Sequence, residues 1–384
     1  MKRRLVRLLV VLGVPSVLLL AGACAADGAP DHLVLDDDDA QSILPDSGAL
    51  GADADAQPDP CSADGWCSFE NPAPKANLVA LWGSAANDLW AVGSFETILH
   101  WDGMSWKTVR TGGPRTYFGV WGTGDAVWVV HSTDVSYRLR RDGSDFEVEG
   151  FDASVSAAPT GRPLSAVWGN APDALYAVGI GQAYTCNPGC DYHDTGGIFV
   201  STGFADGGIG WASAGDVLNP AAGTGGLLAI HGVGEKAWTV GNNGMIASLE
   251  RADGGVTTTQ ENSGTRSRLF AVWTDGDDVW AFGAAGIALH RELVKGMTMW
   301  VEKETGTKAD LRGVWGTSRT NLWIVGANGT VLHFDGAEFR PGAAPLLNGK
   351  TADYHAVWGT GEDDIWAVGE GVIAHYGARP AGAP

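Results

Sequence analysis

The sequence predicts an all-β protein, a seven-bladed β-propeller of four-stranded blades. A repeat near the middle reads Leu311–Gly316, then Asn321–Gly326, then Gly329–Gly336, and the same three motifs recur six more times along the chain. The 384 residues include 56 Gly and 17 Trp, which suits tight turns between short aromatic strands. A fixed period of roughly 40 residues built from short β-like motifs is typical of a β-propeller.

The first two motifs of each repeat predict a pair of antiparallel strands. Seven or eight residues separate their central positions in every repeat, so one short turn joins the two strands each time. We expect these residues to pack in the core between blades, although aromatic rings could also serve as sugar-stacking platforms. The first-motif residues are Trp82, Trp121, Trp168, His231, Trp273, Trp315 and Trp358, and the second-motif residues are Trp90, Trp128, Tyr176, Trp238, Trp280, Trp323 and Trp366.

Recurring polar residues accompany the strands. In the turns before the second motif we expect Asp88, Asp125, Asp173, Asp278 and Asp364 to bond their own backbone. The third motif carries His100, His290, His333 and His375. We expect these histidines to bond turns or neighbouring strands, with a ring of metal ligands as the alternative. A fourth, aromatic segment follows and completes a four-stranded blade; it contains Trp106, Phe146, Trp211, Trp300 and Phe339.

The last repeat lacks its fourth segment, because the chain ends soon after the third motif at Gly377. Residues 64–70 offer a replacement, since Asp64 and Gly65 are followed by aromatic residues. We therefore predict that an N-terminal strand completes the last blade and closes the ring. The predicted propeller spans 61–377, and 378–384 form a C-terminal tail.

The N-terminal residues predict export. Basic residues are followed by an apolar run from Leu8 to Leu20, which is too short to span a membrane and suits a signal peptide over 1–23. The run leads to Cys24 and resembles the lipobox of bacterial lipoproteins, which implies a lipidated Cys24 and an outer-membrane or cell-surface location. An ordinary signal peptide cleaved after Ala23 and a secreted or periplasmic protein is the alternative.

Residues 24–60 predict a disordered acidic tether. From residue 25 onward they hold ten Asp and no Lys or Arg, so they cannot bury enough apolar surface to order. A calcium-binding motif is the alternative, but the spaced ligands and Gly of an EF-hand loop are missing. The net charge of −20 would repel nucleic acid and anionic lipid, so we expect no nucleic-acid partner and membrane contact through the lipid anchor only.

The third repeat carries an insertion over residues 181–194, between its second and third motifs. In an oxidising compartment we expect disulfides Cys61–Cys67 and Cys186–Cys190. The long stretches 149–162 and 215–226 flank the insertion and should lie on the same face over blades two to four. We take the insertion as a candidate binding loop, with a loop that binds nothing and a metal site at Cys186, Cys190 and His193 as alternatives. Its candidate contact residues are Tyr184, Asn187, Asp191, Tyr192 and His193.

The repeat V-W-G, D-x-W-A-V-G, G-T-x-L-H-x-D-G-x-x-W resembles that of lipid-anchored or secreted bacterial propeller proteins of the myxobacterial type. It is more distantly similar to kelch, WD40 and tectonin-type repeats. The resemblance covers 61–377 and implies the fold, but it implies no activity.

The sequence therefore predicts a non-enzymatic, lipid-anchored propeller that acts as a protein-binding or scaffold module without a cofactor. The alternative is a carbohydrate-binding propeller similar to tectonin-type lectins, with near-equivalent sites in each blade. A glycoside hydrolase is a third hypothesis, which would need converging carboxylates. No Gly-x-Ser-x-Gly, P-loop or His-Glu-x-x-His motif occurs in the sequence.

Overall fold

The computed structural model describes residues 61–123, 126–131, 137–142, 145–150, 163–171, 174–186, 190–205, 208–217, 225–252, 255–347 and 349–378. All of them belong to one compact unit, Gln57–Pro384. The described elements are strands and three single-turn 3-10 helices, η1 (Asn242–Gly244), η2 (Ala284–Gly286) and η3 (Ala327–Gly329). Within these ranges no helix is long and apolar enough to cross a membrane.

The strands form four-stranded antiparallel sheets, six of which use consecutive strands. The first two are β2 (Leu78–Ala85), β3 (Asp88–Gly93), β4 (Thr97–Trp101) and β5 (Trp106–Arg110), then β6 (Tyr117–Thr123), β7 (Ala126–His131), β8 (Tyr137–Asp142) and β9 (Asp145–Gly150). The third and fourth are β10 (Leu164–Ala171), β11 (Ala174–Cys186), β12 (Cys190–Ala205) and β13 (Gly208–Val217), then β14 (Leu227–Val233), β15 (Lys236–Gly241), β16 (Met245–Ala252) and β17 (Gly255–Asn262). The fifth and sixth are β18 (Leu269–Thr274), β19 (Val279–Gly283), β20 (Ala288–Val294) and β21 (Met297–Lys303), then β22 (Leu311–Ser318), β23 (Asn321–Gly326), β24 (Thr330–Phe334) and β25 (Phe339–Ala343).

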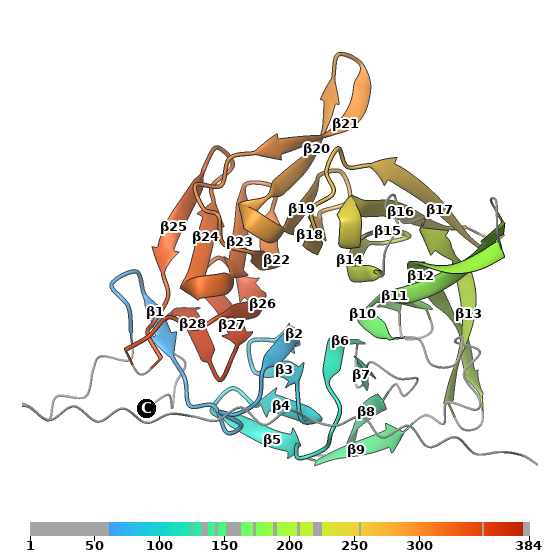
Figure 1. Cartoon of the computed structure of the whole chain (residues 1–384). Coiled ribbons are helices and arrows are strands. Elements are labelled where there is room, and N and C mark those ends of the chain that lie inside the picture. The colour runs from blue at the N-terminus through green and yellow to red at the C-terminus, as the bar shows by residue number, and fades with distance from the viewer. Residues whose placement is uncertain are drawn as a thin grey trace, which may run out of the picture. The chain divides into compact units, whose positions relative to one another are not determined.

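A further sheet is assembled from both ends of the described chain. It contains β26 (Tyr354–Gly361), β27 (Asp364–Gly369) and β28 (Ile373–Gly377), and its outer strand is β1 (Trp66–Ser68), which pairs with β28. The sheets stand around a common centre, with the first strand of each sheet innermost (Figure 1). The prediction of an all-β propeller with four-stranded antiparallel blades is confirmed.

The first and second motifs pair as one short hairpin in every repeat. The central residues face each other across the two strands, as Trp82 faces Trp90 and Trp358 faces Trp366. The second-motif aromatic residues are all buried, and the first-motif Trp residues are buried or half-buried.

The Gly that follows the first-motif Trp has a packing role. A Cβ on Gly122 would lie 2.7 Å from the Trp82 ring, and a Cβ on Gly83 would lie 2.7 Å from the Trp358 ring. The Trp ring of one sheet therefore lies against the Gly of the next sheet, and β26 packs beside β2 in the same manner. Only a residue without a side chain leaves room for the ring.

A second contact recurs at the outer part of two interfaces. Trp366 contacts Trp101 and Trp106 of β4 and β5, with ring centroids 4.8 and 5.6 Å apart. Trp280 meets Phe334 and Phe339 of the following sheet in the same way, at 4.9 and 5.7 Å. Large apolar surfaces are thereby buried between sheets, and no sheet could bury them alone.

The aspartates before the second motif bond neighbouring side chains, whereas we expected them to bond their own backbone. Asp88 accepts hydrogen bonds from the Trp90 indole at 3.2 Å and from Ser84, and its Oδ1 lies 2.8 Å from Nε2 of His100. Asp278 with His290 and Asp364 with His375 repeat the arrangement at 2.6 and 2.8 Å. Each of these histidines also packs on the second-motif Trp of its own sheet. Asp125 and Asp173 lie outside the described residues.

The segment before β2 packs against the last strands of the chain. Trp66 is 1% exposed and contacts Trp323 and Tyr376, each at 5.6 Å between centroids. Phe69 contacts Trp366 at 4.8 Å, and its backbone N–H donates to Ile373. Cys61 and Cys67 form a disulfide at the start of this segment. The predicted signal peptide, Cys24 and the acidic tether lie outside the described residues.

Candidate functional site

A pocket of about 650 Å³ opens at the centre of the sheets, and we call it the central mouth. The first strand of each sheet contributes a lining residue at one equivalent position. These residues are Val79, Phe118, Ser165, Leu228, Phe270, Arg312 and His355.

Each of these seven residues is the extra residue of a β-bulge. The register between the first and second strands shifts at the same place in every sheet, for example between Leu311 and Gly313, so that Arg312 has no partner on β23. A bulge inserts an extra residue and redirects its side chain. The preceding residue, such as Leu311 or Tyr354, is fully buried, and the following one is always Ala or Gly. The bulge residue is thus free to vary while its neighbours hold the strand in place.

The mouth has an apolar side and a polar side. Phe118 is 39% exposed, and Leu228 and Phe270 are half-buried, so apolar surface remains accessible there. On the adjacent sheets, Nη1 of Arg312 lies 2.8 Å from the Asp353 carboxylate and 3.4 Å from Nδ1 of His355. The mouth therefore combines aromatic surface with a fixed guanidinium group.

The protonation of His355 follows from these contacts. Burial, reinforced by the Arg312 guanidinium, lowers the pKa of His355 to about 4, so the ring is neutral near pH 7. Its Nδ1 can then accept a hydrogen bond from Arg312, while Nε2 has no hydrogen-bond partner among the described residues. Burial of Asp353 opposes ionisation, but hydrogen bonds from the Asn328 backbone and from Arg312 outweigh it and lower the pKa of Asp353.

A second guanidinium group lies at the rim. Arg268 is exposed, and its Cζ lies 5.1 Å from the centroid of the Phe270 ring. Stacking on an aromatic face holds the guanidinium group without consuming its hydrogen-bond donors. Asp310 is also at the rim, where it accepts a hydrogen bond from the Ala285 backbone at 3.0 Å.

Below the mouth, the central channel is lined by the small residues that follow each bulge. Added side chains would collide there, since a Cβ on Gly119 or Gly313 would lie 3.0 Å from the next first strand. His231 also lines the channel, and its Nδ1 accepts the Thr274 N–H at 3.2 Å. Burial lowers the pKa of His231 to about 4, which agrees with this acceptor role.

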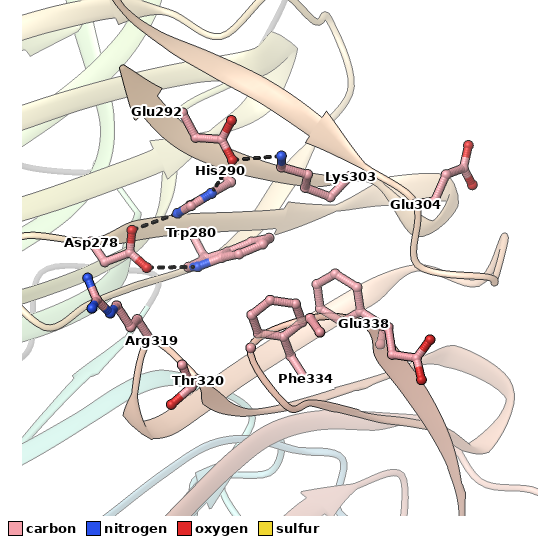
Figure 2. Close-up of a pocket in the computed structure, with 13 residues that line it drawn as sticks. Asp278, Trp280, His290, Glu292, Lys303, Glu304, Arg319, Thr320, Phe334 and Glu338 are labelled. Carbon is pink, nitrogen blue, oxygen red and sulfur yellow. Dashed lines mark hydrogen bonds and ion pairs between the residues drawn. The ribbon is translucent and has the colours of Figure 1, made fainter. Parts of the chain in front are cut away.

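A separate pocket of about 530 Å³ lies between the sheet of β18–β21 and the sheet of β22–β25 (Figure 2). Trp280, Phe334 and Phe339 form its apolar wall. Beside them runs a chain of polar contacts, in which His290 bridges Asp278 and Glu292 at 2.6 Å each and Lys303 lies 2.6 Å from Glu292. We call this the lateral pocket.

The insertion that we took for a loop is an extension of two strands. β11 and β12 continue pairing past Ile180, which lines the central mouth, as far as the facing residues Cys186 and Cys190. Tyr184 and Tyr192 face each other along this hairpin, and His193 faces Ala183. The side chains of Tyr184, Asp191, Tyr192 and His193, residue Asn187 and most of 149–162 and 215–226 lie outside what the structure describes.

Sequence reasoning missed the seven bulge residues. The available signal was one position in each first strand where the residue type changes from repeat to repeat. The residue before it is always Leu or Tyr, and the residue after it is always Ala or Gly. Among the described residues, no group of three or more His, Cys, Asp or Glu residues could hold a metal ion.

No family model matches the chain. A stretch of 74 residues, 19% of the chain, is 34% identical to Tectonin-2 of Physarum polycephalum, and it spans only 20% of that protein.

Solved structures match at low identity. The chain resembles YCF48 from Cyanidioschyzon merolae with a TM-score of 0.60 and 15% identity, covering 82% of this chain and 99% of that one. It resembles YCF48 bound to D1 peptide with a TM-score of 0.59 and 14% identity, covering 83% and 99%. For streptogramin B lyase the TM-score is 0.57 and the identity 12%, over 81% and 96% of the two chains. These likenesses show a β-propeller fold, which is shared by proteins with different functions.

Proposed function

We propose that this chain is a non-enzymatic, protein-binding propeller that takes a segment of a partner protein at the central mouth. The single observation that carries the proposal is the ring of bulge residues. The repeat keeps its residue types where they pack and changes them where side chains line the mouth. A specific binding surface requires such differences, whereas a purely structural channel does not.

The chemistry of the mouth suggests the kind of segment. Phe118, Leu228 and Phe270 offer apolar surface, and the guanidinium groups of Arg268 and Arg312 lie beside it. An extended segment with large apolar side chains and a carboxylate would complement both features. YCF48, a propeller of similar fold, has been solved with a bound D1 peptide, so the fold is compatible with peptide binding.

A peptide-display selection on the purified full-length chain tests this proposal. Selected peptides should carry apolar residues and a carboxylate, and Phe118→Ser or Arg312→Gln should weaken their binding about tenfold or more. Met104→Ser is the matched control, because Met104 is 67% exposed and does not line the mouth. The proposal fails if no peptide is enriched, or if the mouth variants bind as well as the Met104 variant.

The finer architecture is part of the same proposal, namely seven blades closed into a ring by β1. Two observations support it. β1 supplies the fourth strand beside β28, and Trp366 contacts Trp101 and Trp106 in the manner found between consecutive sheets. A closed ring also leaves no apolar end sheet exposed to water.

We further propose that lipidation of Cys24 anchors the chain at the outer membrane or cell surface and that residues 25–60 act as its tether. The apolar run ending at Cys24 and the ten aspartates that follow support this arrangement. Fractionation of the native host tests it, since Cys24→Ala should move the chain from the membrane fraction to the soluble fraction. An unchanged distribution between the two fractions would contradict a lipid anchor at Cys24.

Carbohydrate binding is a second candidate function, favoured by the stretch related to Tectonin-2. Against it, the second-motif Trp rings are buried between sheets, so they offer no exposed faces for sugar stacking. Binding of the purified chain to a glycan array would support this candidate, and a blank array would remove it.

A further inference from the structure

The lateral pocket is open because two of its aromatic residues, Phe334 and Phe339, are smaller than the residues at the corresponding positions of the first sheet. At the corresponding positions the first sheet has Trp101 and Trp106, which fill the space over Trp366. Here Phe334 and Phe339 meet Trp280, and about 530 Å³ remains open beside them. The cavity is therefore a local departure from the contact that Trp101 and Trp106 make with Trp366.

The hairpin of β20 and β21 continues the wall of this pocket outward. His290 and Glu292 line the pocket, and their partners across the hairpin are Val301 and Met299. Residues that face each other on paired strands project from the same side of a sheet. Met299 and Met297 therefore lie on the pocket side, and they are 45% and 67% exposed.

Two exposed methionines on one side of a hairpin are unusual on a protein surface. Methionine is flexible and polarisable, and it recurs at surfaces that bind peptides of varied sequence. The projecting hairpin carries two of the five methionines in the chain. Figure 1 shows this hairpin reaching beyond the neighbouring sheets.

Carboxylates outnumber cations in the lining of the pocket. Four carboxylates line it, those of Asp278, Glu292, Glu304 and Glu338, against the two cations Lys303 and Arg319. Asp278 and Glu292 are already bonded to His290, Trp280 and Lys303. Glu304 is exposed and Glu338 contacts only the exposed Arg340 and its own turn, so these two carboxylates remain accessible at the outer end (Figure 2).

Sugar stacking does not fit the same pocket well. Trp280 is 2% exposed and Phe334 is 8% exposed, because their rings are packed on each other. No open ring face remains on either for a pyranose, whereas the methionines offer apolar surface to side chains.

We propose that the lateral pocket and the pocket-facing side of the β20–β21 hairpin form a second docking site, separate from the central mouth. Its occupant is a segment of a partner protein with a lysine or arginine flanked by large apolar side chains. The basic group lies between Glu304 and Glu338, and the apolar side chains lie on Met297 and Met299. The net charge of −20 favours the approach of such a partner.

The test is a fluorescence-anisotropy titration of the full-length chain with a labelled peptide that has one lysine between leucines. The same peptide with glutamine or glutamate in place of lysine is the ligand control. We expect binding that is lost with glutamate, weakened with glutamine and weakened by salt. The double variant Glu304→Gln, Glu338→Gln and the double variant Met297→Ser, Met299→Ser should each weaken binding about tenfold.

Two variants on the opposite side of the hairpin serve as matched protein controls. Glu302 pairs with Leu289, and Leu293 pairs with Thr298, so both project away from the pocket; both are exposed. Glu302→Gln and Leu293→Ser should bind the lysine peptide as the unchanged chain does, and so should Phe118→Ser at the mouth. The last control separates this site from the proposed function.

Three results would overturn the proposal. One is no binding of the lysine peptide at millimolar concentration. Another is an equal loss of binding in the control variants. The third is occupation of the site by something other than the peptide, either a second copy of the chain that contacts Met297 and Met299 or a glycan in the pocket.

Discussion

The ring of Trp358, on the innermost strand of one sheet, lies directly against Gly83 on the innermost strand of another. The nearest ring atoms, Cζ3 and Cη2, would be 2.7 Å from a Cβ on Gly83. The two residues are 275 positions apart in the sequence, and they join the sheet containing β26 to the sheet containing β2. The same contact joins Trp82 to Gly122 and Trp315 to Gly359.

Replacing Gly83 by Ala should therefore destabilise the protein. The added methyl group meets the Trp358 ring and the Asp88 carbonyl oxygen, so the ring or the strand must move, at a cost of about 1–3 kcal/mol. Thermal unfolding followed by circular dichroism would measure a lower Tm for Gly83→Ala. Gly361→Ala is the control, since nothing lies within 4 Å of its Cβ position. Equal melting of the two variants would mean that the Trp358 contact is not tight in solution.

Deleting residues 61–72 should lower the Tm by many degrees, because β28 and Trp323 would lose the strand and the indole that cover them. Trp66→Ala isolates the indole and should cost about 3–5 kcal/mol, as buried Trp truncations do. Met104→Ala provides an exposed control. A deletion variant that melts with the unchanged chain would remove β1 from any role in holding the sheets together.

Much of this fold was accessible from the sequence because its packing is local and repeated. The spacing of Trp315 and Trp323 indicates a two-strand hairpin, and their pairing across β22 and β23 follows directly. Asp64 and Gly65 before Trp66 marked the start of a fourth strand in the same way. These features need only neighbouring residues and the period of a strand.

Both pockets depend on information that a single repeat does not carry. The direction of Arg312 follows from a bulge, and a bulge is not visible in the alternation of residues. The lateral pocket exists because Phe334 stands beside Trp280 of another sheet, so its discovery requires knowledge of which sheets are neighbours. Asp88 was assigned to its turn because its true partner, His100, lies on a later strand.

The stability of the protein should depend on pH between about 6.5 and 4. His231 and His355 have pKa values of about 4 in the folded chain against 6.5 ordinarily, so these two rings take up protons in this window only when the chain is unfolded. The free energy of unfolding therefore falls as the pH drops from 6.5 towards 4. Melting curves of the unchanged chain and of His231→Gln and His355→Gln at pH 7 and pH 4.5 would check this.

Each glutamine variant should show a smaller fall in Tm between the two pH values than the unchanged chain. Each kcal/mol removed corresponds to roughly 2 °C in a domain this large. Asp353 and Asp364, whose pKa values are lowered by their hydrogen bonds, should act only at still lower pH. An identical pH response in all three proteins would show that the two histidines are not buried as neutral rings.

Variants of Asp364 test the polar cluster, and Asn321 at the equivalent position of another sheet serves as a reference. Its carboxylate accepts hydrogen bonds from Trp366, Thr360 and His375, and His375 is 2% exposed. Asp364→Ala leaves the imidazole and indole N–H groups buried without acceptors, at a cost of about 1–3 kcal/mol for each group.

Asp364→Asn should be milder, because Asn321 already holds the equivalent position on β23. There Oδ1 of Asn321 lies 2.6 Å from Nε2 of His333, while the indole N–H of Trp323 has no acceptor. The asparagine variant should therefore keep the bond to His375 and lose the one to Trp366. In a denaturant titration the free energy of unfolding should be highest for the unchanged chain, lower for Asp364→Asn and lowest for Asp364→Ala. A reversed order of the two variants would contradict a hydrogen-bonding role for this cluster.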